Sequence, residues 1–344
     1  MFGKSGKRER EFAARIIRRC GVAWLASKLP ATDSLLILTY HRIGNSAETQ
    51  FDPGVYSATA DEFHDQISYL KKTASVVSLD EALAFLLGTE KSSSPRCRVL
   101  VTFDDGCIDN YTVAFPILRS LNVQGLFFLI SGMVGTNSIP WWDRIAYILR
   151  TARKSKFSLS YPGHLAVNIT RAGYAAALGR VLYHYKRPDN LDGDRFIAEL
   201  SEACKGSEPP TSLRIFLNWE EAREMTAGGM AVGSHTHTHT VLSQLPLERQ
   251  FDEMMQSRAI LRRQLQTPID TIAYPVGSRT AFTDDTRRLA RQAGYRAAFA
   301  FHGGSNIPGR IAPYELARSY VGSPTLARFR TQSAIGKCTG YFWP

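Results

Sequence analysis

The chain has 344 residues, of which 44% are hydrophobic and 21% are charged, a composition typical of a soluble globular protein. This length can bury a large core, and it suits one large α/β domain, alone or with an insertion. No stretch holds the roughly 18 consecutive apolar residues that a membrane-spanning helix requires, which argues against an integral membrane protein.

More than half of the net charge of +11 lies in the first 28 residues, where eight lysines and arginines against two glutamates give +6. Phe12, Ile16, Cys20 and Trp24 recur there at every fourth position. Residues 1–30 therefore predict a helix with one apolar stripe among basic side chains. Such a helix can lie on an anionic membrane surface, or its stripe can dock on the rest of the protein.

The same segment does not indicate a secretory signal. Its apolar core, GVAWLAS, is short, Lys28 follows it directly, and no A-x-A cleavage site is present. We therefore expect a cytoplasmic protein, peripheral on the inner membrane face if the helix binds lipid. The five cysteines lack C-x-x-C spacing, so reduced thiols are expected rather than disulfides or a cysteine zinc site.

Short apolar runs alternate with helical patterns along residues 31–344. The expected strands are Leu35–Thr39, Arg98–Phe103, Gln124–Ile130, Met230–Gly233, Thr271–Tyr274 and Ala297–Phe301. The expected helices are Asp61–Leu70, Asp109–Leu121, Trp219–Ala227, Glu248–Leu265 and Asp284–Ala293. This alternation predicts a mostly parallel sheet or barrel. In such barrels, functional residues gather on the loops that follow the carboxyl ends of the strands.

The alternation is interrupted at residues 136–217, where the sequence is helix-like and mixed in charge. Stretches such as WWDRIAYILRTARK and RAGYAAALGRVLYHYK carry no chemical motif. We interpret this segment as a helical insertion that covers or flanks one rim of the barrel.

The stretch VTFDDG ends a predicted strand in two adjacent carboxylates, Asp104 and Asp105. Two carboxylates at one strand end repel each other, and a cation beside the pair relieves that repulsion. The alternative interpretation is structural, with Asp105 capping the helix that follows.

Three histidines, His235, His237 and His239, lie on alternate positions of GSHTHTHT, just after another predicted strand. On a helical turn, His235 and His239 lie on one side, whereas on an extended chain all three share a face. One carboxylate and two imidazoles leave a coordination position open for water, as in catalytic metal sites. The two stretches together therefore indicate a metal centre.

TFDDG followed by SHTHTH resembles the first two motifs, T-F-D-D and H-[ST]-x-x-H, of the polysaccharide deacetylases of carbohydrate esterase family four, the NodB-homology family. The resemblance implies a distorted (β/α) barrel with a zinc-type site that removes N-acetyl groups from N-acetylhexosamine sugars. It also implies that Asp104 is the general base. The implied metal ligands are Asp105, His235 and His239, while His237 falls on a variable position of the motif.

The family's third motif, R-x-P-[YW]-G, corresponds here to Ala273–Gly277, with the sequence AYPVG. The backbone N–H of Val276 would face the developing oxyanion, a role that does not depend on the side chain. Tyr274 and Pro275 are expected to contact the substrate. The motif's arginine, which would orient Asp104, is replaced by alanine, so another group must hold this carboxylate.

Leu38-Thr-Tyr-His41 matches the family's L-x-x-H motif, which usually lies near the carboxyl terminus. The first and last strands of a closed barrel are neighbours, so this strand can move along the chain without moving in space. The pattern is similar to circularly permuted deacetylases that act on poly-N-acetylglucosamine. It implies that His41 is the general acid and that Leu38 lines a pocket for the acetyl methyl group. His302, which follows another predicted strand, is the alternative acid.

These expectations favour a metal-dependent hydrolase, with Zn²⁺ as the expected ion, that removes N-acetyl groups from a polysaccharide or a lipid-linked saccharide. One alternative is a catalytically impaired barrel that binds carbohydrate without turnover. Another is a metal-dependent hydrolase of a different C–N amide bond. Nucleic-acid binding is not expected, because the excess charge is concentrated at the amino terminus and no recognition module is present.

Overall fold

The computed structural model describes residues 33–89, 97–304, 306–307, 309, 312–322 and 325–339. The basic helix predicted at residues 1–30 lies outside the described residues.

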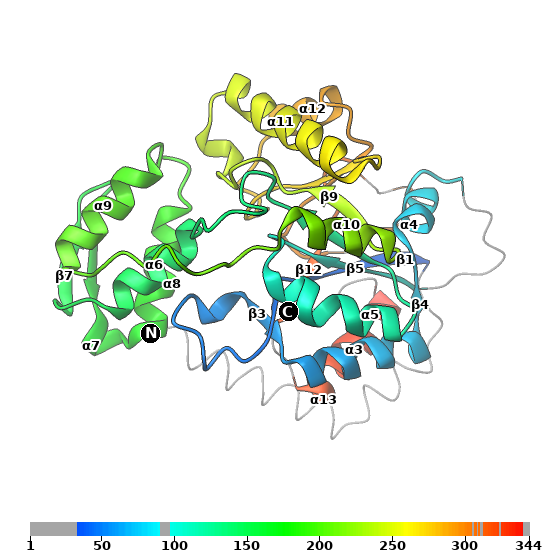
Figure 1. Ribbon diagram of the computed structural model, residues 1–344, viewed down its shortest axis with the longest axis horizontal. Helices are drawn as coiled ribbons and strands as arrows, with labels where there is room; N and C mark the ends of the chain where they lie inside the picture. The colour runs from blue at the N-terminus through cyan, green and yellow to red at the C-terminus, as the bar shows by residue number, and fades with distance from the viewer. Residues whose placement is uncertain are drawn as a thin grey trace.

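A parallel sheet of eight strands lies at the centre of the molecule (Figure 1). The strand order is β11-β10-β9-β6-β5-β1-β12, and β4 pairs with β5 beside this path. The strands are β1 (Ser34–Tyr40), β4 (Ser75–Val76), β5 (Cys97–Phe103), β6 (Gly125–Leu129), β9 (Ala231–Ser234), β10 (Thr271–Ala273), β11 (Ala297–Phe299) and β12 (Ser319–Tyr320). All six predicted strands are present, with small differences at their ends, whereas β4 and β12 were not predicted from the sequence.

The sheet curls so that the first strand of the chain meets the last. β1 pairs in parallel with β12, with Leu38 opposite Ser319. At the opposite edge of the sheet, β11 contacts the segment that precedes β12 through one isolated bridge. In this bridge the Ala300 N–H donates to the Leu316 carbonyl at 2.8 Å. The barrel closes through this bridge rather than through a full ladder, which confirms the predicted distorted (β/α) barrel.

Helices surround the sheet (Figure 1). They are α3 (Ala60–Thr73), α4 (Leu79–Leu86), α5 (Phe115–Ser120), α10 (Trp219–Ala227), α11 (Leu247–Leu265), α12 (Asp284–Gln292) and α13 (Leu326–Thr339), and the π-helical turn η2 (Asn110–Ala114) leads into α5. Local sequence explains where they begin. Thr59 and Glu62 form a capping box at the start of α3, and Ser78 and Glu81 form another at α4.

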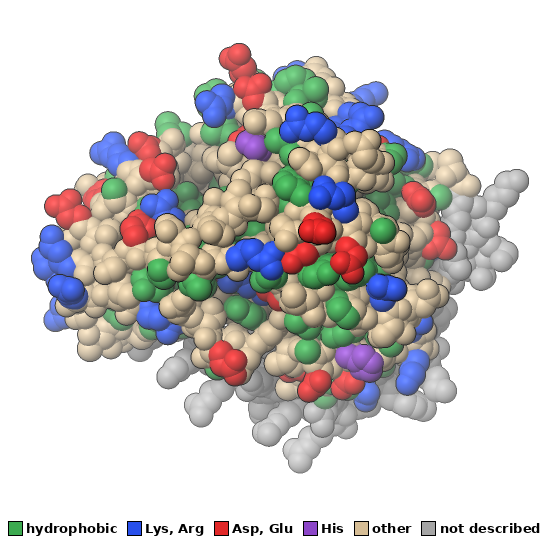
Figure 2. Space-filling view, viewed as in Figure 1, with side chains coloured by type: hydrophobic (Ala, Val, Ile, Leu, Met, Phe, Trp, Pro, Cys, Tyr) green, Lys and Arg blue, Asp and Glu red, His purple; other side chains and the backbone are tan. Residues whose placement is uncertain are grey.

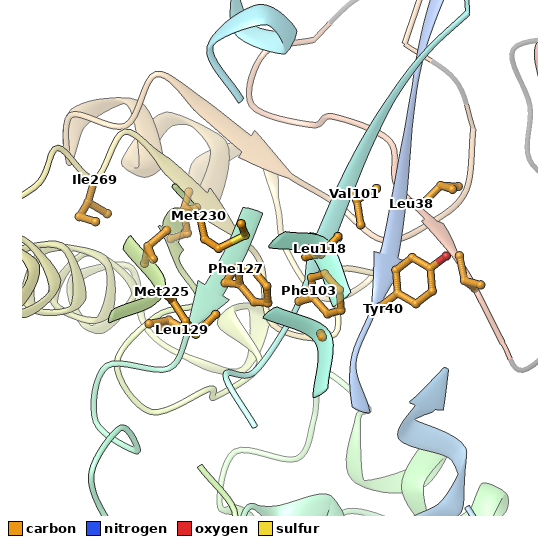
Figure 3. Packing of buried hydrophobic residues seen from close by; sticks show 14 of the residues in the cluster. Leu38, Tyr40, Val101, Phe103, Leu118, Phe127, Leu129, Met225, Met230 and Ile269 are labelled. Atoms are coloured by element: carbon orange, nitrogen blue, oxygen red, sulfur yellow. The ribbon is translucent and has the colours of Figure 1, made fainter. Parts of the chain in front are cut away.

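Alternate residues of the buried strands enter two different hydrophobic clusters. Leu38 and Tyr40 of β1 belong to the cluster between the sheet and the surrounding helices, together with Phe103 of β5 and Leu118 of α5 (Figure 3). Leu35 and its alternating partners enter a second cluster, which includes α4. Both faces of the strands are therefore buried, which explains why they read as continuous apolar runs.

The insertion forms a separate helical group beside the sheet (Figure 1). It contains α6 (Trp141–Arg150), α7 (Ile169–Ala172), α8 (Tyr174–Tyr185) and α9 (Gly193–Cys204), together with the antiparallel hairpin of β7 (Lys156–Leu159) and β8 (Leu165–Asn168). The group has its own core, with fully buried residues such as Ile145, Val181, Phe196 and Leu200. The hairpin was not predicted from the sequence.

The remaining short elements are β2 (Arg42–Ile43), η1 (Pro53–Val55), β3 (Tyr56–Ala58) and η3 (Leu242–Gln244), which precedes α11. The segment that carries β2 and β3 contacts the insertion, because Arg42 and Asp52 both bond to Asp143 of α6. In the described part of the chain, no helix has the length and apolar character needed to cross a membrane. On the face shown in Figure 2, basic and acidic side chains are interspersed.

Candidate metal centre and catalytic cleft

The predicted polar residues meet at one end of the barrel. Asp104 and Asp105 follow β5, His235 follows β9, and His41 follows β1. Because these strands are parallel, their carboxyl ends share one rim, as expected for barrels of this kind. A cleft of about 500 Å³ opens at this rim, and Val276, which follows β10, also lines it.

Asp105, His235 and His239 form a buried group whose ligand atoms lie within 4.8 Å of one another. Oδ1 of Asp105 is 3.5 Å from Nε2 of His235 and 3.4 Å from Nε2 of His239. Tetrahedral bonds of about 2.0–2.2 Å place neighbouring ligand atoms about 3.3–3.6 Å apart. The two separations therefore fit a metal ion bound between these side chains.

Each histidine of GSHTHTHT has a different environment. The Nδ1 atom of His235 is 2.8 Å from the Ala273 carbonyl, a contact that directs Nε2 toward Asp105. The ring of His239 packs on Trp142, with centroids 4.7 Å apart. His237 instead places Nδ1 3.0 Å from the Ser131 hydroxyl. The loop therefore presents two of its three imidazoles to the site.

The loops that carry these ligands have an unusual backbone. Asp105, His239 and Val276 have φ values of 76°, 61° and 61°, in the left-handed region that residues other than glycine rarely occupy. Such conformations are enriched at functional sites, where the surrounding structure enforces them. Asp105 does not cap the following helix, because Asp109 occupies that N-cap position.

Asp104 is held by an arginine that the sequence patterns did not identify. The Arg318 guanidinium donates two hydrogen bonds to the Asp104 carboxylate, at 2.6 and 2.8 Å, and both side chains are almost fully buried. The Nε–H of Arg318 also donates to the Ala300 carbonyl at 3.0 Å, which fixes the orientation of the guanidinium plane. Arg318 therefore supplies the orientation expected from the arginine that is missing in the third motif.

Burial and neighbouring charges act on the two carboxylates in opposite directions. Burial alone would raise the pKa of Asp104, but the Arg318 guanidinium, helped by His235 and His41, holds that pKa below its usual range. Burial and the adjacent Asp104 charge raise the pKa of Asp105 well above its usual value. The negative charge of Asp105 is thus poorly compensated by protein groups, as expected beside a cation site.

Burial also acts on the imidazoles. It lowers the pKa values of His235 and His239, and it lowers the pKa of His41 to about 4. All three rings are therefore neutral near pH 7, the form in which a histidine can ligate a metal. Nε2 of His41 lies 3.9 Å from Oδ2 of Asp104.

Four other predicted residues lie away from the cleft. Leu38 is 1% exposed and belongs to the hydrophobic cluster that also holds Tyr40 and Phe103 (Figure 3), so it cannot line a pocket for substrate. Tyr274 is fully buried, and its hydroxyl donates to the Tyr314 carbonyl at 3.0 Å. Pro275 is buried and is not among the residues that line the cleft. Nε2 of His302 lies 3.2 Å from Glu315, and His302 does not line the cleft either.

The insertion flanks the rim of the barrel and forms one side of the cleft, although its sequence did not show which of its residues line it. Trp141 and Trp142 from α6 and Tyr183 from α8 line the cleft, and so does Lys186, which directly follows α8. Trp141 stacks on Tyr185 of the insertion core at 4.3 Å while it also reaches the cleft.

Comparison with known proteins agrees with this geometry. The sequence profile of the polysaccharide deacetylase family matches residues 91–298. The chain is 23% identical to the Bacillus subtilis protein YxkH over 274 residues, which are 80% of this chain and 66% of that protein. It is 29% identical to a poly-beta-1,6-N-acetyl-D-glucosamine N-deacetylase of Staphylococcus aureus over 124 residues, which are 33% of this chain and 42% of that enzyme. The chain thus spans less than two thirds of the length of either relative.

Two solved structures share the fold. IcaB from Ammonifex degensii is 25% identical with a TM-score of 0.57, over 89% of this chain and 98% of that one. The Streptococcus pyogenes deacetylase PplD, solved in complex with acetate, is 21% identical with a TM-score of 0.52, over 83% of this chain and 92% of that one. From the family match over residues 91–298, together with the barrel and its Asp-His-His group, the chain belongs to the polysaccharide deacetylase family.

Proposed function

We propose that this protein removes N-acetyl groups from N-acetylhexosamine units of a polysaccharide or a lipid-linked saccharide, and that it uses a divalent metal, Zn²⁺, to do so. The observation that carries the proposal is the convergence of Asp105, His235 and His239 on one buried point beside Asp104. Family membership and the similarity to a poly-beta-1,6-N-acetyl-D-glucosamine N-deacetylase support the choice of substrate.

Asp105, His235 and His239 would hold the metal. One carboxylate and two neutral imidazoles suit Zn²⁺ and leave coordination positions free for water and substrate. When bound, the ion acts as a Lewis acid toward the amide carbonyl and makes the water more acidic.

Asp104 acts as the general base and takes a proton as the water oxygen attacks the acetyl carbon. Arg318 keeps this carboxylate ionised and correctly oriented through its two hydrogen bonds. The backbone N–H of Val276 donates to the oxyanion that forms at the carbonyl oxygen.

His41 acts as the general acid when the C–N bond breaks. Since burial lowers its pKa to about 4, its ring is neutral before the reaction. The proton that His41 delivers to the leaving amine therefore comes from the attacking water by way of Asp104, whose carboxylate is 3.9 Å away. Acetate and the free amine are the products.

The test is acetate release from N-acetylglucosamine oligomers by Zn²⁺-loaded protein. We expect chelator to abolish release and added Zn²⁺ to restore it. Asp104→Asn should lower kcat by about 10²–10⁴-fold, because a general base contributes that much, while Zn²⁺ binding persists. Asp105→Asn should lose both activity and Zn²⁺. If the loaded wild type and Asp104→Asn release equal amounts of acetate, the proposal fails.

We also propose that the basic segment at residues 1–30 holds the protein at the cytoplasmic face of the membrane. The support is its charge of +6 and its apolar stripe. The full chain should sediment with vesicles that contain phosphatidylglycerol and not with pure phosphatidylcholine vesicles. High salt should release it, because salt screens this attraction. Equal sedimentation with both vesicles would contradict this proposal.

A further inference from the structure

The insertion places a lysine beside the proposed metal centre. Lys186 follows α8 directly and lines the same cleft as Asp105 and His239. Its side chain is half-buried, and its ammonium group lies 5.7 Å from the centre of the Trp141 ring. Tyr183, one turn earlier on α8, is 78% exposed at the mouth of the cleft, where its ring is free to stack on a sugar.

Lys186 has no short-range anionic partner among the described residues, with no carboxylate oxygen within 4.0 Å of its ammonium group. The neighbouring Arg187, by contrast, pairs with Asp189 through hydrogen bonds of 2.5 and 2.8 Å. Burial lowers the pKa of Lys186, whereas the more distant charges of Asp52 and Asp105 raise it. A partly desolvated ammonium without a direct partner gains most from an anionic ligand.

The net charge of the metal-loaded cleft also favours an anionic ligand. At full charge, the carboxylates of Asp52, Asp104 and Asp105 contribute −3, and Lys186 together with Arg318, which lies behind Asp104, contributes +2. Arg187 also lines the cleft, but Asp189 neutralises its charge. A divalent ion changes the resulting −1 to +1. With its metal in place, the cleft is therefore net positive, and Lys186 is its cation without a salt bridge among the described lining residues.

We infer that Lys186 binds a carboxylate or a phosphate group of the saccharide, next to the sugar that loses its acetyl group, so that the substrate is an anionic glycan. This inference rests on the proposed function, because it assumes that the saccharide occupies this cleft. Lys186 then determines specificity and takes no part in the chemical step. Residues of the insertion thereby select the substrate, and residues of the barrel carry out the reaction.

The inference is tested by calorimetric binding to Zn²⁺-loaded full-length protein that carries Asp104→Asn as a common background, which keeps the metal and separates saccharide recognition from turnover. Three probes are used: neutral chitotetraose, a tetrasaccharide that alternates N-acetylglucosamine with glucuronic acid, and N-acetylglucosamine 1-phosphate. Lys186→Gln removes the charge, and Lys186→Arg keeps it. Lys154→Gln is the matched control, since Lys154 is exposed on the same insertion and does not line the cleft.

We expect Lys186→Gln to weaken binding of at least one anionic probe by about tenfold, the size of a charge-assisted hydrogen bond, and to leave chitotetraose binding unchanged. The anionic probe that responds identifies the group as a carboxylate or a phosphate. Lys186→Arg should retain most of the affinity, and Lys154→Gln all of it. Kd values that change equally for neutral and anionic probes in Lys186→Gln, or a background protein with Lys186 intact that binds no anionic probe, would overturn the inference.

Turnover separates this inference from the proposed function. If Zn²⁺-loaded protein releases no acetate from any of these probes while the Lys186-dependent binding persists, the proposed function fails and the binding site stands. If acetate is released with the same kcat/KM from acidic and neutral oligomers by both wild type and Lys186→Gln, the deacetylase stands and the inference fails.

Discussion

Asp104 and Arg318 are 214 positions apart in the chain and form a buried, two-point contact. The desolvation cost of two buried charges is offset only when the geometry is good and the remaining donors are satisfied. Here the third donor of the guanidinium reaches the Ala300 carbonyl. The contact therefore serves orientation as well as charge balance.

Replacing Arg318 should separate orientation from metal binding. Arg318→Lys keeps a positive charge but loses the planar fork, so we expect kcat to fall by about 10–100-fold with little change in KM. Zn²⁺ affinity should be unchanged, because Arg318 does not touch Asp105 or the two histidines. A variant that keeps full kcat would show that Asp104 needs no such support, and loss of Zn²⁺ would show that Arg318 acts on the metal site.

At the scale of elements, the loop after β5 serves two purposes. Asp104 and Asp105 face the cleft, and a few residues later the Asp109 carboxylate accepts a hydrogen bond from the Ile43 N–H of β2 at 2.9 Å. This hydrogen bond connects the loop after β5 to β2, which directly follows His41. Burial raises the pKa of Asp109 to about 6, although the nearby Arg42 guanidinium lowers it.

This raised pKa predicts a pH-dependent effect of Asp109→Asn. The folded state holds the proton more tightly than the unfolded chain, whose carboxyl has a pKa of about 3.9. The stability that this proton contributes is therefore lost as pH rises toward and through 6. Relative to wild type, the free energy of unfolding of Asp109→Asn should improve by on the order of 1 kcal/mol between pH 5 and pH 8. Urea unfolding at both pH values measures this, and a difference that does not vary with pH would contradict it.

At the scale of the whole molecule, one buried ion pair joins the barrel to the insertion. Arg42 of β2 donates to Asp143 of α6 at 2.5 Å, and Asp143 also accepts from the Asp52 N–H at 3.1 Å. Asp143 is fully buried, and Arg42 is 4% exposed. This pair links the strand that follows His41 to the helix that carries Trp142.

Breaking the pair should be costly. Asp143→Ala leaves the Arg42 guanidinium buried without its partner, so we expect a loss of about 3–5 kcal/mol in the free energy of unfolding. The double variant Arg42→Met with Asp143→Leu should recover much of this loss, because it removes both charges together. Thermal unfolding of the three proteins gives the comparison. A double variant as unstable as Asp143→Ala would mean that the contact matters for something other than its charges.

The sequence by itself determined the chemistry of the proposed metal centre and the class of fold. The residue type determines which ligand atom a side chain offers, and the alternation of strands and loops is a local pattern. Asp104, Asp105, His235 and His239 could therefore be named without a structure. The L-x-x-H motif also implied that β1 lies beside the last strand of the barrel, although that strand, β12, was itself not predicted.

Only the tertiary structure decided which distant residues complete the site. Arg318 and Lys186 lie in stretches with no motif, and only the packing of barrel and insertion brings them to Asp104 and the cleft. The prediction that Leu38 and Tyr274 contact the substrate was wrong. Side chains alternate across a strand, and these two belong to the hydrophobic core. A pattern along the chain specifies chemistry, whereas the side of a strand or helix that faces the cleft depends on contacts between segments far apart in sequence.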